Sequence, residues 1–168
     1  MKLGLIGYGK AGSAVAAILG QDPRYRLAWV ANRSGEPRSV RVESNDVPVI
    51  PLDALTLGAW LDAHPVDALV DFSNAAAVGV YGEQVMQRGL MLVTAISSYS
   101  PEEMAYLQFL GAHSRVLCSP NITVGINFLI LAARLLREIA PFADVEILEQ
   151  HFRDKAEVSG TAKKIAQS

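Results

Sequence analysis

A glycine-rich turn near the amino terminus places the tightest constraint on the fold. Gly7, Gly9 and Gly12 form the pattern G-x-G-x-x-G, directly after the apolar run 2–6 and directly before the helical pattern 11–20. In a βαβ unit these glycines allow a tight turn, close approach of the backbone to a pyrophosphate, and close packing of the helix on the sheet. The motif therefore predicts a dinucleotide site at the start of a helix, where free N–H groups favour phosphate. The alternative is a tight turn that binds no ligand.

The rest of the chain alternates short β-rich runs with longer helical patterns. We expect strands at 2–6, 26–31, 47–50, 66–72, 90–95, 115–119 and 144–149. We expect helices at 11–20, 52–63, 75–88, 100–113 and 124–139. This alternation predicts an α/β, Rossmann-like doubly wound parallel sheet, and the nearly continuous apolar character of the middle strands agrees. The polar stretch 33–46 is expected to be a mobile loop.

A change of rhythm at "PNITVG" predicts a domain boundary near Asn121. We expect a dinucleotide-binding Rossmann domain over 1–121 and a partial α+β segment for substrate binding and oligomerisation over 122–168. The strand expected at 144–149 would have little beside it, and unpaired backbone groups are costly. We therefore predict a homo-oligomer, a dimer or tetramer, assembled through this strand and the helix at 124–139. A truncated chain is the alternative explanation.

Composition and charge argue against several classes of function. The net charge of −2 gives no electrostatic reason to expect binding to nucleic acid or to an acidic membrane. Arg134 and Arg137 interrupt the longest apolar helix, so it is predicted to be buried in protein and not in a bilayer. The single cysteine, Cys118, cannot form an internal disulfide, and no signal peptide is recognisable, so we expect a cytoplasmic protein. We expect no metal site.

The residues that follow the second strand bear on the choice of dinucleotide. A carboxylate that binds the ribose 2′-hydroxyl of NAD is expected about 20 residues beyond the glycines, and Asn32, Arg33 and Ser34 stand there instead. The lack of a carboxylate removes repulsion against a 2′-phosphate, while Arg33 offers a planar donor fork and Ser34 a hydroxyl. We therefore predict NADPH as the cofactor, with NADH as the alternative. The alternative for Arg33 is a solvated loop charge.

Four later segments, "VDALVDFS", "SPNITVGINFLI", "VEILEQHFRDK" and "SGTA", follow the glycine turn in an order that resembles dihydrodipicolinate reductase, the reductase of the lysine and diaminopimelate pathway. The resemblance covers essentially the whole chain and is most specific over 119–162. It implies that His151 is an acid/base group, that Lys155 donates a proton, and that a helix N-terminus clamps a substrate carboxylate through Ser159, Gly160 and Thr161. These residue types suit such roles, since histidine titrates near neutral pH and helix N-termini bind anions. The alternative for His151 is an ordinary surface histidine.

The predicted cofactor-binding residues combine the glycine turn, the end of the second strand and the positions that the resemblance implies. They are Gly7, Tyr8, Gly9, Lys10, Ala11, Gly12, Asn32, Arg33, Ser34, Phe72, Ser73, Thr94, Ala95, Ser119 and Asn121.

The chain departs from the family pattern on the substrate side. Phe152 stands where the family has a second histidine, and Ile96 stands where it has a hydroxyl residue. Family members also continue well past the helix that follows "SGTA". We predict that Phe152 and Ile96 line the substrate pocket and limit the use of dicarboxylates, so the chain would be a truncated or divergent member.

The predicted activity is NADPH-dependent reduction of a carboxylated imine or conjugated C=N or C=C bond. Dihydrodipicolinate is the substrate that the resemblance implies. One alternative is a related reductase that acts on another α-imino or cyclic imino acid in a specialised amino-acid pathway. Another is a nucleotide-binding relative without catalytic activity.

Overall fold

A seven-stranded sheet organises the amino-terminal part of the chain in this computed structural model, which describes residues 1–33, 38–119, 121–148, 162 and 165–166. The strand order is β3-β4-β2-β1-β5-β6-β7. The strands are β1 (Lys2–Ile6), β2 (Arg26–Asn32), β3 (Arg38–Val42), β4 (Asn45–Pro51), β5 (Ala68–Asp71), β6 (Met91–Thr94) and β7 (Val116–Cys118). All neighbouring strands run parallel except β3 and β4. The predicted Rossmann-like parallel sheet is therefore confirmed.

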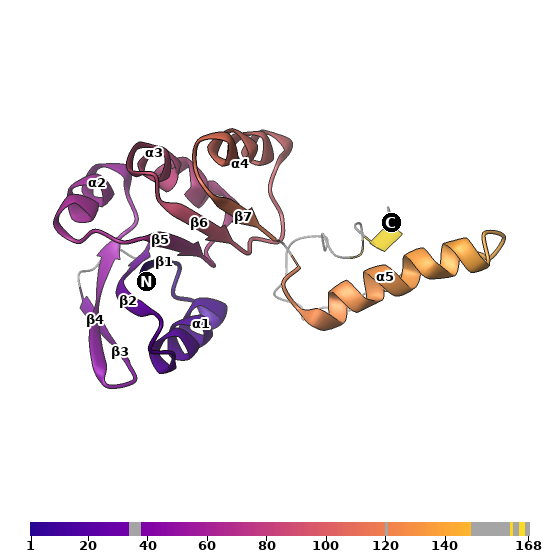
Figure 1. Ribbon diagram of the computed structural model, residues 1–168, viewed down its shortest axis with the longest axis horizontal. Helices are drawn as coiled ribbons and strands as arrows, with labels where there is room; N and C mark the ends of the chain where they lie inside the picture. Colours follow the sequence, from indigo (N-terminus) through magenta and orange to yellow (C-terminus); the bar gives the residue numbers. More distant parts are fainter. Residues whose placement is uncertain (34–37, 120, 149–161, 163–164, 167–168) are drawn as a thin grey trace.

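Helices cover both faces of the sheet, as a doubly wound fold requires. These helices are α1 (Lys10–Gln21), α2 (Ala54–Ala63), α3 (Val78–Arg88) and α4 (Pro101–His113), with a short 3₁₀ turn η1 (Ala75–Ala77) before α3. A fifth helix, α5 (Val124–Ile139), follows β7. Figure 1 shows α2, α3 and α4 on one face of the sheet and α1 on the other. The start of α4 follows directly from its sequence, because Ser100 and Glu103 form a reciprocal capping box around the first-turn proline.

The alternation of side chains along the central strands divides the core between these two faces. On β1, Ile6 packs with the α2–α4 side, while its neighbour Leu5 packs with the α1 side, and both are fully buried. On β2, Trp29 packs with the α2–α4 side and Val30 packs with the α1 side. Both faces of the central strands are thus covered by apolar side chains. Because these strands run parallel, their carboxyl ends lie along one edge of the sheet.

The prediction of a mobile loop over 33–46 was wrong from Arg38 onward. Residues 38–42 form β3, which pairs antiparallel with β4, and β4 itself begins at Asn45, earlier than predicted. Val42 and Val47 from this hairpin are buried. The alternation of polar residues with Val40 and Val42 is the pattern of a half-buried strand. Residues 38–42 form a strand because their backbone pairs with the edge of β4.

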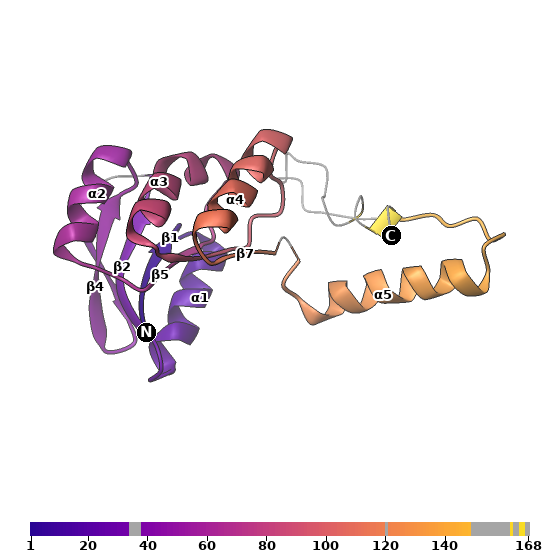
Figure 2. The ribbon, with the colours of Figure 1, turned by 45° about the horizontal axis from the view of Figure 1, so that its top comes forward.

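The helix α5 extends away from the sheet and its covering helices, as Figures 1 and 2 both show. After α5, residues 143–148 contain no strand, so the prediction of a strand from residue 144 was wrong over 144–148. Residue 149, the last of that predicted strand, lies outside the described residues. No other described strand lies at hand to pair with this segment, and a lone strand leaves its backbone groups unsatisfied. No described helix combines the length and apolar character needed to cross a membrane.

Candidate dinucleotide-binding site

The glycine-rich turn lies between the carboxyl end of β1 and the start of α1. Gly7 has a φ of +88°, and a Cβ added to it would lie 2.8 Å from the Cα of Ser73. A Cβ on Gly12 would lie 2.1 Å from the carbonyl oxygen of Gly7. Both positions therefore require glycine, because real Cβ atoms do not approach other atoms so closely. The turn brings the backbone against the loop that follows β5.

Gly9, the N-cap residue of α1, faces open space instead. A Cβ added to Gly9 would meet no atom within 4 Å, so packing does not explain a glycine here. No side chain caps α1, and its first turn carries no acidic residue. The free N–H groups and the positive end of the helix dipole at this position suit a phosphate. The turn therefore fits the pyrophosphate of a dinucleotide.

Two adjoining cavities lie over this turn at the carboxyl edge of the sheet. The first has a volume of about 380 Å³ and is lined by Gly7, Tyr8, Gly9, Asn32, Arg33, Arg38, Leu52, Phe72, Ser73 and Asn74. The second has a volume of about 240 Å³ and is lined by Ala11, Phe72, Ser73, Asn74, Ala75, Ala95, Ile96, Ser97 and Ser98. The segment 72–74 lines both cavities. Open α/β sheets bind their ligands at this carboxyl edge.

A larger depression of about 580 Å³ lies at the opposite edge of the sheet, between the first halves of β2 and β4. It opens because these strands pair only from Val30 and Val49 onward. This depression has no glycine turn and no helix N-terminus aimed into it. Size alone does not make it the functional site, so we assign the site to the two cavities at the carboxyl edge.

A buried carboxylate at the end of β5 fixes the loop shared by the two cavities. Asp71 is fully buried, with 0% of its surface exposed. Its Oδ1 accepts hydrogen bonds from the N–H of Ser73 at 2.8 Å and from the Ser73 hydroxyl at 2.6 Å, and its Oδ2 accepts one from the Tyr81 hydroxyl at 2.6 Å. Burial raises the pKa of Asp71, because desolvation outweighs the lowering effect of these hydrogen bonds.

Two tyrosines continue this polar cluster toward the end of β6. Burial and the nearby Asp71 raise the pKa of Tyr81. Burial also raises the pKa of Tyr99 to about 12, although the hydrogen bond with Thr94 opposes that shift. The hydroxyls of Tyr99 and Thr94 lie 2.6 Å apart. Both tyrosine hydroxyls are thus neutral at physiological pH. Together these side chains connect the ends of β5 and β6, which flank the second cavity.

The two cavities bring together ten of the predicted site residues. Gly7, Tyr8, Gly9, Asn32, Arg33, Phe72, Ser73, Ala11, Ala95 and Ile96 line one or both of them. Five predicted cofactor residues do not line either cavity: Lys10, Gly12, Thr94, Ser119 and Asn121. Seven predicted residues lie outside the described part of the chain: Ser34, His151, Phe152, Lys155, Ser159, Gly160 and Thr161. The roles predicted for these seven residues remain predictions.

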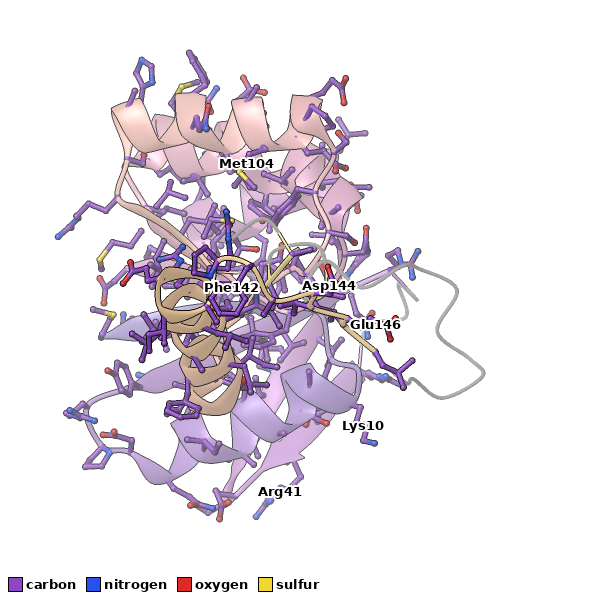
Figure 3. The ribbon with its side chains drawn as sticks, turned by 90° about the vertical axis from the view of Figure 1, so that its right-hand side faces the viewer. Lys10, Arg41, Met104, Phe142, Asp144 and Glu146 are labelled. Carbon is purple, nitrogen blue, oxygen red and sulfur yellow. The ribbon has the colours of Figure 1, made fainter. Side chains whose placement is uncertain are left out.

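Each predicted residue that does not line a cavity has a structural position of its own. The Lys10 side chain points outward from the start of α1 (Figure 3). Gly12 lies beneath the turn, and the Thr94 hydroxyl is buried against Tyr99. Ser119 donates its N–H to the Thr94 carbonyl at 2.9 Å, and the Asn121 carbonyl accepts a hydrogen bond from Asn127 at 2.8 Å. The last two residues therefore connect β6 with α5.

Sequence reasoning missed Arg38, Leu52 and Asn74 in the first cavity, and it missed the buried pair Asp71 and Tyr81. Asp71 carries a recognisable signal, because an acid at the end of an apolar strand faces the ligand-binding edge of a parallel sheet. Arg38 had none, because its place depends on the long-range pairing of β3 with β4.

A family model described as dihydrodipicolinate reductase, N-terminus, matches residues 1–122. The 4-hydroxy-tetrahydrodipicolinate reductase of Myxococcus xanthus is 33% identical over 135 residues, which cover 79% of this chain and 49% of that relative. The reductase of the same name from Methanocorpusculum labreanum is 32% identical over 122 residues, which cover 70% of this chain and 47% of the relative. The chain thus matches about half the length of these two relatives.

The same fold is found in the solved structure of dipicolinate-bound dihydrodipicolinate reductase from Paenisporosarcina sp. TG-14. The TM-score is 0.72 over 99% of this chain and 64% of that chain, at 22% identity, which shows likeness of fold alone. The sequence match carries the assignment, since the family model spans most of the chain and includes the glycine turn and both cavities. The chain therefore belongs to the dihydrodipicolinate reductase family.

Proposed function

We propose that the chain is the cofactor-binding part, with some of the substrate-binding part, of a pyridine-nucleotide-dependent reductase acting on a carboxylated cyclic imine of the dihydrodipicolinate type. One observation carries the proposal. Two cavities meet along segment 72–74 over a glycine turn whose Gly9 leaves room for a phosphate. A dinucleotide has two nucleoside halves joined by a pyrophosphate, and this arrangement offers a place for each part.

The first cavity suits the adenosine half of the cofactor, with the pyrophosphate at Gly9 and the start of α1. Asn32 and Arg33 lie at the carboxyl end of β2, where the ribose of a bound dinucleotide is recognised. No carboxylate lines this cavity among the described residues. NADPH is therefore the cofactor that we propose in preference to NADH, since its 2′-phosphate meets a cation and no acid.

The second cavity suits the nicotinamide half, and the nicotinamide supplies the hydride when the cofactor is bound. Ala95 and Ile96 line this cavity from the end of β6, and Phe72 and Ser73 line it from the end of β5. Asp71 and Tyr81 hold the β5 side of the cavity in place. These residues orient the ring and exclude water, and they leave proton transfer to groups outside the cavity.

Proton transfer and substrate binding belong, in this proposal, to the segment 122–168. His151 and Lys155 would provide the proton, and the Ser159–Thr161 nest would bind a substrate carboxylate. These roles rest on the family motif, and their residues lie outside the described part. Loss of a general acid typically lowers the rate by on the order of a hundredfold or more. Turnover of alanine variants at His151 and Lys155, with cofactor affinity measured in parallel, tests this assignment.

A related imine reductase is the second candidate, and Ile96 favours it. Only 8% of the Ile96 surface is exposed, and this apolar residue lines the proposed nicotinamide cavity. An apolar wall offers no hydrogen bond to a second carboxylate of a dicarboxylic substrate. Steady-state rates with dihydrodipicolinate and with monocarboxylic cyclic imines, each with NADPH, distinguish the two candidates.

We also propose that the active form is a homo-oligomer assembled through α5. Phe128, Leu131 and Leu135 follow the i, i+3, i+7 spacing of one helix face, and their exposed fractions are 66, 63 and 55%. An apolar face this exposed is costly in water, and a second copy of the chain would cover it. Light scattering at micromolar concentration tests this proposal, and a stable monomer with α5 intact would contradict it.

A further inference from the structure

We propose that Arg38 is a specificity-determining residue of this site and forms, with Arg33, a two-arginine clamp for the 2′-phosphate on the adenine ribose of the cofactor. This inference rests on the proposed function and goes beyond it. The strand that bears Arg38 was expected to be a mobile loop. The structure instead pairs this strand with β4, and Arg38 lines the same cavity as Asn32 and Arg33 at the end of β2.

The sheet register explains why Arg38 reaches the cavity. Arg38 is the first residue of β3 and pairs with Val49 of β4, and Val49 pairs in turn with Val30 of β2. The β2 strand ends two residues later at Asn32, and Arg33 follows. Arg38 therefore lies at the same edge of the sheet as Arg33, although β3 runs in the opposite direction. Both arginines line the cavity of about 380 Å³.

The charges around this cavity favour an anion. Arg38 makes no ion pair with any described residue, in contrast to Arg24, Arg41 and Arg88. The acid that follows the lining residue Leu52 is Asp53, and its carboxylate accepts hydrogen bonds from the N–H groups of Leu55 and Thr56 at the start of α2. Asp53 is therefore occupied by capping its helix. The described lining carries two arginines and no acid.

A ribose 2′-phosphate is the ligand group that fits this charge. A phosphate monoester carries a charge of roughly −1.5 to −2 near neutral pH and presents several acceptor oxygens. Two planar guanidinium groups can donate to different oxygens of one phosphate. The free 2′-hydroxyl of NADH has no charge to neutralise. Arg38 should therefore strengthen the binding of NADPH and have little effect on NADH.

Arg41, on the same strand, provides a matched control. An odd separation of three positions places Arg38 and Arg41 on opposite faces of β3. Arg41 forms an ion pair with Asp46 at 3.2 Å, and its side chain points into solvent at the far end of the hairpin (Figure 3). Loss of Arg41 removes the same charge from the same strand without touching the cavity.

The test compares the unaltered chain with Arg38→Ala, Arg38→Lys and Arg41→Ala by calorimetric titration of NADPH, NADH, adenosine 2′,5′-bisphosphate and adenosine 5′-monophosphate. Loss of one charged hydrogen-bond partner should weaken NADPH and the bisphosphate by roughly tenfold to a hundredfold in Arg38→Ala. Affinity for NADH and the monophosphate should stay within about twofold. Arg38→Lys keeps the charge, so its NADPH affinity should lie between those of Arg38→Ala and the unaltered chain. The NADPH affinity of Arg41→Ala should match that of the unaltered chain.

Two failures of this test are distinguishable. If the unaltered chain binds NADPH and Arg38→Ala binds it equally well, the clamp is wrong while the proposed cofactor site stands. If the unaltered chain binds none of the four ligands, the proposed function fails and the clamp with it. An equal loss of affinity for NADPH and NADH in a folded Arg38→Ala variant would also overturn the clamp, because the arginine would then act without regard to the 2′-phosphate.

Discussion

The hydroxyl of Tyr81 donates a 2.6 Å hydrogen bond to the fully buried carboxylate of Asp71, which also holds the backbone and side chain of Ser73. A side chain from α3 and the loop after β5 thus share one acceptor. This loop lines both cavities, so the geometry of the proposed site depends on a contact between two residues that line neither cavity.

Tyr81→Phe should destabilise the fold, because it leaves one oxygen of a buried carboxylate without its donor. An unsatisfied buried polar group costs roughly 1–3 kcal/mol, and more when the group is charged. Urea denaturation of both proteins measures the loss. Tyr25→Phe is the matched control, since the Tyr25 hydroxyl makes no hydrogen bond with a described residue. This variant should leave the free energy of unfolding nearly unchanged. Equal stability of Tyr81→Phe and the unaltered chain would contradict the importance of this contact.

The free energy of unfolding should decrease as pH rises through the titration of Asp71. Burial raises the pKa of Asp71 in the folded state above its ordinary value of 3.8. Between the unfolded and the folded pKa, the folded state binds more protons than the unfolded state, so stability falls as pH rises through this window. Asp71→Asn removes the titrating group. The stability of the unaltered chain relative to Asp71→Asn should therefore be greatest at low pH and decrease as pH rises above about 4. A relative stability that increases over this range would show that the pKa is lowered instead.

Alanine substitutions at Gly9 and Gly12 should affect different properties: Gly9→Ala should weaken cofactor binding, and Gly12→Ala should lower the stability of the fold. The Cβ of Gly9→Ala meets no protein atom within 4 Å, so the variant should fold, with a loss of unfolding free energy of about 1 kcal/mol or less at this N-cap. Its NADPH affinity should nevertheless fall, because the methyl group occupies the phosphate approach. The Cβ of Gly12→Ala would lie 2.1 Å from the Gly7 carbonyl oxygen, so this variant should lose stability before affinity can be assessed. Thermal denaturation and calorimetric titration separate the two effects.

The pair Ile96 and Phe152 should control substrate choice. The double variant Ile96→Thr with Phe152→His adds polar groups at both positions, and it should raise kcat/KM for dihydrodipicolinate relative to a monocarboxylic cyclic imine. Initial rates with NADPH measure the ratio. If the unaltered chain already reduces dihydrodipicolinate efficiently and the double variant gains nothing, the specialised-substrate candidate is wrong.

Local signals in the sequence account for much of the fold. The glycine turn predicted the junction of β1 and α1, and the helical pattern over 100–113 predicted α4. Apolar runs predicted the central parallel strands, because strands covered on both faces have few polar residues. These features depend on neighbours close in the chain or on burial alone, so they are accessible from one sequence.

Features that depend on distant partners were not predicted. The strand β3 needs the edge of β4, so its own sequence predicts only a loop. The contact between Asp71 and Tyr81 joins a strand end to a helix ten residues away, and neither residue type indicates which partner it will have. Conversely, residues 144–148 have the composition of a strand and form none, because no described strand lies beside them. Periodicity indicates which residues are suited to a strand, and the partner decides whether the strand forms.

The most direct test of the proposed dinucleotide site at the glycine turn is a calorimetric titration of NADPH into the unaltered chain and into Gly9→Ala, with folding of both checked by circular dichroism. We predict saturable binding of one NADPH per chain and a loss of affinity of at least about tenfold in a folded Gly9→Ala variant, since the glycine turn receives the pyrophosphate. Failure of the unaltered chain to bind NADPH or NADH, or equal affinity in the two proteins, would contradict it.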